Sequence, residues 1–342
     1  MRGYLPILLL LCGVAAAAPC AAHPPYGLVA DPAGNFYFSD LETVWRLSAD
    51  GKLSVFRAPV PETHVHTLAL APDGAIEGDQ NRYEPATQRF YSGLWRRTLA
   101  GAERAIVPLT DRAPAGAGLW QDRAGNRYTS QWLSSADRRM VLLRRQPEGR
   151  VEIMFDESGG APRPSQATVE SVGGMAFGAD GGLFFANRGV LRRLAPDGNV
   201  TTIYEGGNGS NLRGLTVAPD GRVLAADMGA KAVLAVGADG IASTLYREAE
   251  PWLPTAVALS GDRLLVLEAN AEPTEYEDRV RVIEVTKQGG RVVAQPARPA
   301  LRQAAQASAP PPHLEKSGPG VGTILLAALA GAGVLWAALR FR

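Results

Sequence analysis

The sequence predicts an all-β protein with the architecture of a six-bladed β-propeller, in which each blade has four strands. Three observations predict this fold. An apolar run, a glycine turn and a second apolar run occur in this order six times along the chain, and a second glycine turn follows within each unit. Stretches with a helical period of 3.6 residues are nearly absent from these units. Six units of four short strands each are the pattern of a radial propeller.

The six repeats are defined by their turns. Asp50-Gly51 and Asp197-Gly198 stand between alternating apolar runs, and Asp-Gly is a strong hairpin signal because the turn requires a positive φ. The first turn of each unit is expected at Gly34, Gly74, Gly125, Gly181, Gly221 and Gly261, and the second at Gly51, Gly101, Gly149, Gly198, Gly240 and Gly290. The repeats lie near residues 24–58, 64–108, 114–156, 170–206, 211–248 and 253–295, within a propeller domain of residues 23–297. Few residues precede the first repeat, so we expect the ring to close by packing of blade one against blade six.

The amino terminus has the three-part pattern of a secretory signal, which we assign to residues 1–22. A basic residue and a long apolar stretch precede a group of small residues. Cleavage after Ala18 and cleavage after Ala22 both fit this pattern, and an uncleaved anchor helix is the alternative. Cys12 and Cys20 are the two cysteines of the chain and both lie in this segment, so we expect no disulfide within the propeller.

A second apolar segment lies near the carboxyl terminus. Residues 321–339 contain no charge and are numerous enough to span a bilayer at about 1.5 Å per residue. Arg340 and Arg342 make residues 340–342 a short cytoplasmic tail, because positive charge just beyond a span favours the cytoplasmic side. Residues 298–320 are rich in Ala, Gln, Pro and Ser, which predicts an extended stalk. We therefore predict an exported single-pass membrane protein, with its propeller on the periplasmic side of a bacterial inner membrane.

One face of the predicted propeller carries longer connections than the other. If the strands of a blade are named A to D from the axis outward, the short A–B and C–D hairpins share one face. The enlarged connections lie on the other face: B–C loops at 79–93, 131–139 and 268–279, and D–A crossings at 58–66 and 156–172. Long loops on a rigid scaffold are a usual place for binding, so we predict a functional face there. Neutral insertion is the alternative, since loop closure costs little extra with length.

Two rings of residues are expected to border the central channel on that face. The A strands begin near Tyr26, His66, Gly116–Gly118, Gly173, Arg213 and Thr255, and the B strands end at Asp40, Asp79, Gln131, Asn187, Asp227 and Glu268. The second ring is acidic or amide-bearing in every repeat, as a polar mouth for a cation or a small polar ligand would be. The alternative is structural, because Asp and Asn often end strands by bonding nearby backbone amides. The predicted binding residues are His64, His66, Asp79, Asn187, Arg213, Asp227 and Glu268.

His64 and His66 are the candidates for metal ligation, because His-x-His on a strand places both rings on one face. Glu62 is close in sequence, and Asp79 ends the B strand of the same blade. The other two histidines of the chain lie in the tails outside the propeller, so we predict no metal site. No cofactor is expected, and a divalent cation such as Ca²⁺ is the alternative.

Other sequence signals exclude several classes of protein. A formal net charge of +1 gives no basic footprint for nucleic acid. The sequence contains no Gly-rich phosphate loop, no Gly-x-Ser-x-Gly elbow and no Cys-x-x-Cys motif. Among the aromatic residues, we expect Trp95 and Trp120 in the blade cores and Trp132 and Trp252 exposed on loops.

Two repeat segments, Pro25–Asn35 (PYGLVADPAGN) and Leu212–Gly221 (LRGLTVAPDG), carry a family resemblance. Their pattern resembles NHL repeats and the propeller superfamily of gluconolactonases, senescence marker proteins and strictosidine synthases. Gluconolactonase-like enzymes hold a divalent cation with Glu, Asn and Asp at the starts of A strands, and none of the matching residues here is acidic. Strictosidine synthase-like chemistry relies on a Glu near the mouth, a position that Glu268 matches. NHL-type propellers commonly serve as interaction platforms.

Two functions follow from these observations. The first is a membrane-anchored binding or scaffolding module for a protein partner or small polar ligand, which the missing metal triad favours. The alternative is a gluconolactonase-like or strictosidine synthase-like hydrolase or lyase, working at the central mouth with His66, Arg213, Asp227 and Glu268. There Arg213 would bind a carboxylate, and Glu268 or His66 would act as general base. A deep pocket with convergent Arg213 and His66 would favour the enzyme, whereas a shallow mouth rimmed by exposed aromatic residues would favour the binding module.

Overall fold

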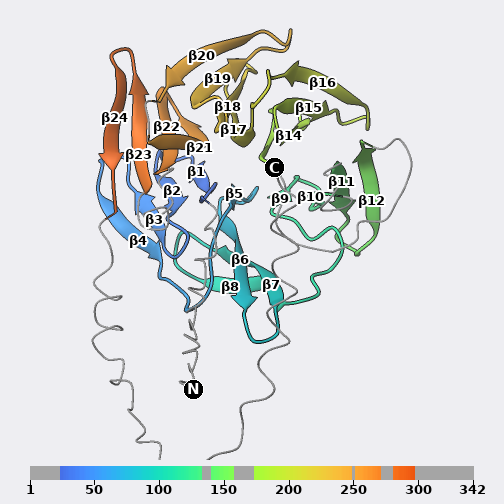
Figure 1. Cartoon of the computed structure of the whole chain (residues 1–342). Helices are drawn as coiled ribbons and strands as arrows, with labels where there is room; N and C mark the ends of the chain where they lie inside the picture. Colours follow the sequence, from blue (N-terminus) through green and yellow to red (C-terminus); the bar gives the residue numbers. More distant parts are fainter. Residues whose placement is uncertain (1–23, 133–139, 158–172, 249–250, 271–279, 297–342) are drawn as a thin grey trace, which may run out of the picture. The chain divides into compact units, whose positions relative to one another are not determined.

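The computed structural model describes residues 24–132, 140–157, 173–248, 251–270 and 280–296. These residues belong to one compact unit, a six-bladed β-propeller, and the predicted fold is confirmed. Figure 1 shows the six sheets arranged around a central axis.

Each blade is an antiparallel sheet of four strands that are consecutive in the sequence. Blade one contains β1 (Leu28–Ala30), β2 (Phe36–Ser39), β3 (Val44–Leu47) and β4 (Leu53–Arg57). Blade two contains β5 (Leu68–Leu70), β6 (Ile76–Glu84), β7 (Arg89–Arg97) and β8 (Glu103–Thr110). Blade three contains β9 (Trp120–Gln121), β10 (Arg127–Trp132), β11 (Met140–Arg145) and β12 (Val151–Asp156).

The second half of the ring repeats this plan. Blade four contains β13 (Met175–Phe177), β14 (Leu183–Asn187), β15 (Val190–Leu194) and β16 (Val200–Glu205). Blade five contains β17 (Leu212–Val217), β18 (Val223–Asp227), β19 (Ala232–Val236) and β20 (Ala242–Arg247). Blade six contains β21 (Trp252–Ser260), β22 (Arg263–Asn270), β23 (Val280–Thr286) and β24 (Gly289–Ala294).

The hairpin between β1 and β2 shows why the glycine turns mark the blades. Gly34 has a φ of 85°, a conformation that residues with a Cβ rarely adopt. The Oδ1 atom of Asp31 accepts hydrogen bonds from the backbone N–H groups of Ala33 (3.0 Å) and Asn35 (2.9 Å). The positive φ of Gly34 and the hydrogen bonds to the carboxylate of Asp31 therefore together close the hairpin.

The last hairpin differs from its prediction. The positive φ, 118°, belongs to Gly289 rather than to Gly290, which pairs with Val285 inside the β23–β24 ladder. Thr286 pairs directly with Gly289, so the hairpin closes one residue earlier than the sequence spacing predicts. With two adjacent glycines, the sequence alone does not fix which one occupies the turn.

The ring closes by packing between blade six and blade one. Phe36 and Phe38 of β2 lie in one apolar cluster with Leu265 and Leu267 of β22 and Val282 of β23. Burying such a side chain contributes about 1.5–3 kcal/mol. In the part of the chain that the structure describes, every sheet consists of four consecutive strands, and blade six packs directly against blade one, as predicted.

A buried ion cluster links blade two to blade three. The carboxylate of Glu77, which is fully buried, accepts hydrogen bonds from Arg127 Nη1 (2.7 Å) and Nη2 (3.1 Å) and from Arg96 Nη1 (3.0 Å). Bidentate arginine contacts satisfy both oxygen atoms of the carboxylate. At this position, hydrogen-bonded charged side chains therefore join the two blades.

The connections divide the propeller into two faces. The turn face carries the A–B and C–D hairpins of each blade, and the loop face carries the B–C and D–A connections. The segment at 79–93, predicted as an enlarged loop, is instead an extended hairpin, because β6 and β7 stay paired as far as Glu84 and Arg89. Its many polar residues concealed this strand pairing in the sequence. The predicted loops at 131–139, 156–172 and 268–279 fall mainly outside the described residues.

The two predicted ends of the chain also lie outside the described residues. These are the signal segment 1–22, the stalk 298–320, the span 321–339 and the tail 340–342. Among the residues that the structure describes, no helix has the length and apolar character needed to cross a bilayer.

Candidate functional site

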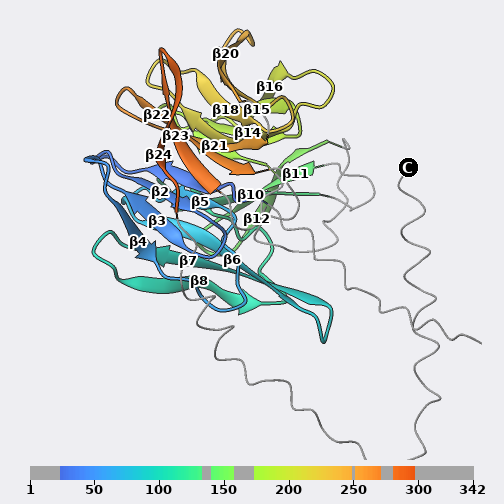
Figure 2. The ribbon, with the colours of Figure 1, turned by 60° about the vertical axis from the view of Figure 1, so that its left-hand side comes forward.

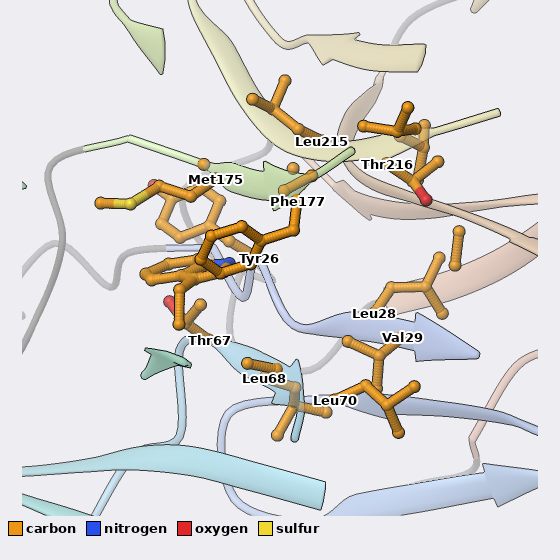
Figure 3. Close-up of a pocket in the computed structure, with 18 of the residues that line it drawn as sticks. Tyr26, Leu28, Val29, Thr67, Leu68, Leu70, Met175, Phe177, Leu215 and Thr216 are labelled. Carbon is orange, nitrogen blue, oxygen red and sulfur yellow. The ribbon is translucent and has the colours of Figure 1, made fainter. Parts of the chain in front are cut away.

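A cavity of about 300 Å³ lies on the axis of the propeller and is bordered by the innermost strand of every blade. Most of the side chains that line it are apolar, but polar atoms contribute almost half of its exposed wall. Figure 3 shows Leu28, Met175, Phe177 and Leu215 lining it from strands of different blades. Apolar side chains with a few placed polar groups are typical of sites for small molecules.

Arg213 and Tyr26 line the cavity where innermost strands begin, on the loop face, whereas Gln121 and Thr216 line it near the ends of β9 and β17. The guanidinium carbon of Arg213 lies 4.9 Å from the centroid of the Tyr26 ring. This is a cation–π geometry. The backbone N–H of Tyr26 donates a hydrogen bond of 2.6 Å to the carbonyl oxygen of His66. Tyr26 therefore joins Arg213 to the backbone of His66, but His66 is not among the residues that line the cavity.

A bulge positions Arg213. Leu212 pairs with Asp227 and Leu215 with Ala225, so Arg213 and Gly214 together lie opposite the single residue Ala226. A bulge bends its strand and re-aims the side chains next to it. A second irregularity occurs at the neighbouring strand start, in β21 between Pro254 and Ala256. Because each irregularity interrupts the alternation of its strand, alternation alone could not have predicted the direction of the side chains at these two positions.

A hydrogen-bond network fixes the imidazole of His66. The side-chain amide of Asn81 donates to Asp79 Oδ2 (3.0 Å), and its Oδ1 accepts from Ser92 Oγ (2.8 Å). The same amide nitrogen lies 3.1 Å from His66 Nδ1, which must then accept. The neutral ring consequently carries its proton on Nε2, an assignment made from the network. In this form His66 is a hydrogen-bond donor rather than a base.

Asp79 and Asp227 hold the backbone at the starts of two innermost strands. Asp79 Oδ1 accepts from the N–H groups of His66 (2.7 Å) and Thr67 (2.9 Å). Asp227 accepts from Asn211 N–H (2.8 Å) and from the hydroxyl of Ser210 (2.6 Å). Asp79 and Asp227 therefore fit the structural alternative, in which the polar residues at the ends of the B strands bond nearby backbone amides. Their predicted binding roles stay predictions.

The donor set at the strand starts does not suit the divalent cation that the family resemblance implies. The matching positions hold Tyr26, His66, Gly173, Arg213 and Thr255, and a guanidinium at one of them repels a second cation. His64 lies beside His66, with ring centroids 6.0 Å apart. Within the described ranges, no group of three or more His, Cys, Asp or Glu side chains could hold a metal ion. The residues at these strand starts therefore do not suit a divalent cation.

Glu268 lies between blades five and six, in a buried pair with Glu248. Arg281 bridges the pair, from Nε to Glu268 Oε2 (2.7 Å) and from Nη2 to Glu248 Oε2 (3.1 Å). Burial and, next to it, a hydrogen bond with Glu248 raise the pKa of Glu268 to about 8. Glu268 therefore carries its proton at neutral pH, shared with Glu248.

The surroundings of this carboxyl pair were not predicted from the sequence. The guanidinium of Arg281 lies 4.1 Å from the ring of Trp252, which is buried rather than exposed as predicted, because it packs under that arginine. The hydroxyl of Tyr246 donates to Glu248, and burial raises the pKa of Tyr246. Glu268 does not line the axial cavity. Its predicted role as a general base stays a prediction.

Asn187 is the remaining predicted binding residue. Its amide nitrogen donates to both carboxylate oxygens of Glu157, at 3.2 and 3.1 Å. Arg192 pairs with the same carboxylate at 3.0 Å. The Oδ1 atom of Asn187 is buried and has no hydrogen-bond partner within the described residues. Asn187 thus belongs to a polar cluster that joins blade four to Glu157, which follows the last strand of blade three, and it does not line the axial cavity.

Comparison with known proteins shows the class of fold. No protein-family model matches the sequence, and no curated protein matches it. Virginiamycin B lyase from Staphylococcus aureus is a similar solved structure, with 16% identity, coverage of 80% of this chain and 84% of that one, and a TM-score of 0.47. Regucalcin from Agrobacterium tumefaciens has 18% identity, coverage of 81% and 95%, and a TM-score of 0.45.

A third similar structure is a gluconolactonase from Xanthomonas campestris, with 13% identity, coverage of 71% and 83%, and a TM-score of 0.49. Identities this low show the fold alone. The six-bladed propeller itself is established by the strand topology of this chain.

Proposed function

We propose that the protein binds a small, largely apolar molecule bearing a carboxylate or an ester or lactone carbonyl, and acts on it as a hydrolase or lyase. The observation that carries this proposal is the stacking of Arg213 on Tyr26 in a cavity to which all six blades contribute. A cavity with Arg213 in its wall favours the enzyme over the binding module, although His66 is not among the residues that line it.

Arg213 has the central role in this proposal. Its guanidinium binds the anionic group or the developing negative charge of the carbonyl oxygen. This interaction strengthens as negative charge develops on oxygen, which is the requirement for lowering an acyl-transfer barrier. His66 has a positioning role, because its carbonyl oxygen accepts a hydrogen bond from the backbone N–H of Tyr26, on which Arg213 stacks. In the hydrolase case, water attacks the polarised carbonyl carbon, the C–O bond to the leaving alkoxide breaks, and the proton of the water passes to that alkoxide.

The test is a comparison of Arg213→Ala with Arg222→Ala in the full chain. Arg222 belongs to the same blade but lies at the turn face, paired with Asp220 at 2.8 Å. Lactones, esters and simple aryl carboxylates are the probes, measured by calorimetric binding and by turnover. Arg213→Ala is expected to weaken binding at least tenfold and Arg222→Ala to leave it unchanged. Equal effects of the two variants would contradict the proposal.

We also propose that the propeller is exported and held at a membrane through residues 321–339. The support is the uncharged apolar segment and the two arginines that follow it. Fractionation of the expressing cells tests this attachment. Alkaline carbonate should leave the full chain in the membrane pellet, whereas a chain ending at residue 320 should be released. Release of the full chain by carbonate would exclude a spanning anchor.

A further inference from the structure

The hairpin of β6 and β7 projects from the loop face as an arm. We call residues 80–93 the β6–β7 arm. Its ladder continues from the Ile76–Arg97 pair to the Glu84–Arg89 pair, and both strands have nine residues. No other pair of B and C strands in the described part of the chain is as long. Figure 2 shows the arm extending past the neighbouring strands of the propeller.

The end of the arm presents two aromatic side chains. Tyr83 and Phe90 are directly opposite each other in the ladder, and their ring centroids are 4.8 Å apart. They are 41% and 68% exposed, so neither ring is buried in the apolar core between blades. Rings of this kind are favoured where an apolar layer meets water.

Arginine side chains flank the two rings. The guanidinium of Arg82 lies 4.9 Å from the ring of Tyr91, and Arg89 pairs with Asp111 at 2.7 Å while remaining largely exposed. Two arginines and one glutamate give residues 82–91 a net positive charge. Exposed aromatic rings beside basic residues suit the headgroup region of a bilayer with anionic lipid.

The path of the chain places the arm on the side from which the carboxyl-terminal segment departs. Each fourth strand of a blade runs from the turn face to the loop face, so β24 ends at Ala294 on the loop face. The tip of the arm, at residues 85–88, lies on the same face. Residues 297–342 follow and include the apolar segment 321–339. The tip of the arm and the end of β24 therefore share one face of the propeller.

We propose that the β6–β7 arm contacts the outer surface of the bilayer, with Tyr83 and Phe90 in the headgroup layer and Arg82 and Arg89 next to anionic lipid. This inference rests on the proposed membrane attachment. The arm is then a second point of contact, which restricts the tilt of the propeller relative to the membrane. The loop face, on which the innermost strands begin, then faces the lipid surface.

The test uses the full chain in nanodiscs that contain zwitterionic and anionic phospholipid. One cysteine is introduced by Phe90→Cys or, as a matched control, by Leu99→Cys, in a chain with Cys12→Ala and Cys20→Ala. Leu99 is also exposed and belongs to the same blade, but it lies at the β7–β8 turn on the turn face. Each cysteine carries an environment-sensitive dye. Co-elution of the chain with the discs reports the attachment separately from the arm.

The expected result is a blue shift of the dye at position 90 and no shift at position 99. Co-elution without a shift at position 90 would overturn the inference about the arm and leave the attachment intact. Failure to co-elute would overturn both. A shift at position 90 that appears in detergent when the chain is concentrated would indicate contact with a second copy of the chain and would also overturn the inference.

Discussion

The guanidinium of Arg213 lies 4.9 Å from the ring centroid of Tyr26, although 187 positions separate the two residues in the sequence. The contact joins blade five to the segment just before blade one. It occurs on the loop face, where the innermost strands begin, and the backbone N–H of Tyr26 there also donates a hydrogen bond to the carbonyl oxygen of His66. The orientation of Arg213 therefore depends on a residue that is not part of its own blade.

Replacing Tyr26 should disturb this orientation without removing the charge. Tyr26→Ala is expected to weaken binding of a carboxylate probe about two- to thirtyfold, since a cation–π contact contributes about 0.5–2 kcal/mol. Calorimetric titration of the full chain measures the effect. Tyr91→Ala is the control, because Tyr91 also lies under an arginine, Arg82, but in the β6–β7 arm. Equal binding by both variants and the parent chain would show that Tyr26 does not position Arg213.

Calcium should not stabilise the propeller. The strand starts at the mouth include a guanidinium, and the carboxylates of Asp79 and Asp227 accept hydrogen bonds from backbone N–H groups. A ligand at a hundred times its dissociation constant adds about 2.7 kcal/mol to the stability of a protein. Thermal unfolding after chelation, with and without Ca²⁺, Mn²⁺ or Zn²⁺, is expected to give the same midpoint. A rise with any of these ions would place a metal site where the donor set argues against one.

The sequence could predict the blades because their signals are local. A glycine turn preceded by a carboxylate, as at Gly34 after Asp31, depends only on a few adjacent residues. The bulge at Arg213 and Gly214 could not be predicted in this way, since an inserted residue changes the strand alternation on which the prediction rests. The β6–β7 arm was missed because its polar residues resemble a loop, although its strands are paired.

The carboxyl pair of Glu248 and Glu268 could not be predicted for a different reason. The two residues belong to different blades, and only the packing of β20 against blade six brings them together with Arg281. Glu268 was singled out as the one glutamate at a B-strand end, but its protonation depends on burial and on its neighbour. The same packing buries Trp252, which the sequence suggested was exposed.

The ion cluster of Glu77 should contribute strongly to stability. Glu77→Ala leaves Arg96 and Arg127 without their shared carboxylate between two blades, and breaking a buried ion pair costs about 3–5 kcal/mol. Urea unfolding of the full chain measures this loss. Glu152→Ala is the control, because its partners Arg144 and Arg150 are more accessible to water, and such pairs contribute little to stability. Similar losses in the two variants would show that the buried cluster has no special role.

Glu268 should make the stability of the propeller depend on pH. Its pKa is about 8 in the folded chain, above the ordinary value of 4.5, so the folded chain retains a proton that the unfolded chain has lost between these values. Stability from this group is therefore fully present below about pH 4.5 and falls as the pH rises toward 8, by up to about 1.4 kcal/mol per pH unit. Glu248 is the other carboxyl group of the pair. Tyr246 and Arg281 are the titratable and charged groups that contact the two carboxyl groups.

Glu268→Gln tests this dependence, because glutamine has the shape of the protonated carboxyl and does not titrate. It can still accept from Arg281 and donate to Glu248. We expect the unfolding midpoint of the variant to vary less between pH 5 and 8 than that of the parent chain, and to exceed it at pH 8. Glu84→Gln, an exchange in the β6–β7 arm, is the control and should follow the parent curve. Parallel curves for Glu268→Gln and the parent chain would mean that Glu268 is already ionised at neutral pH, with Arg281 outweighing the effect of burial.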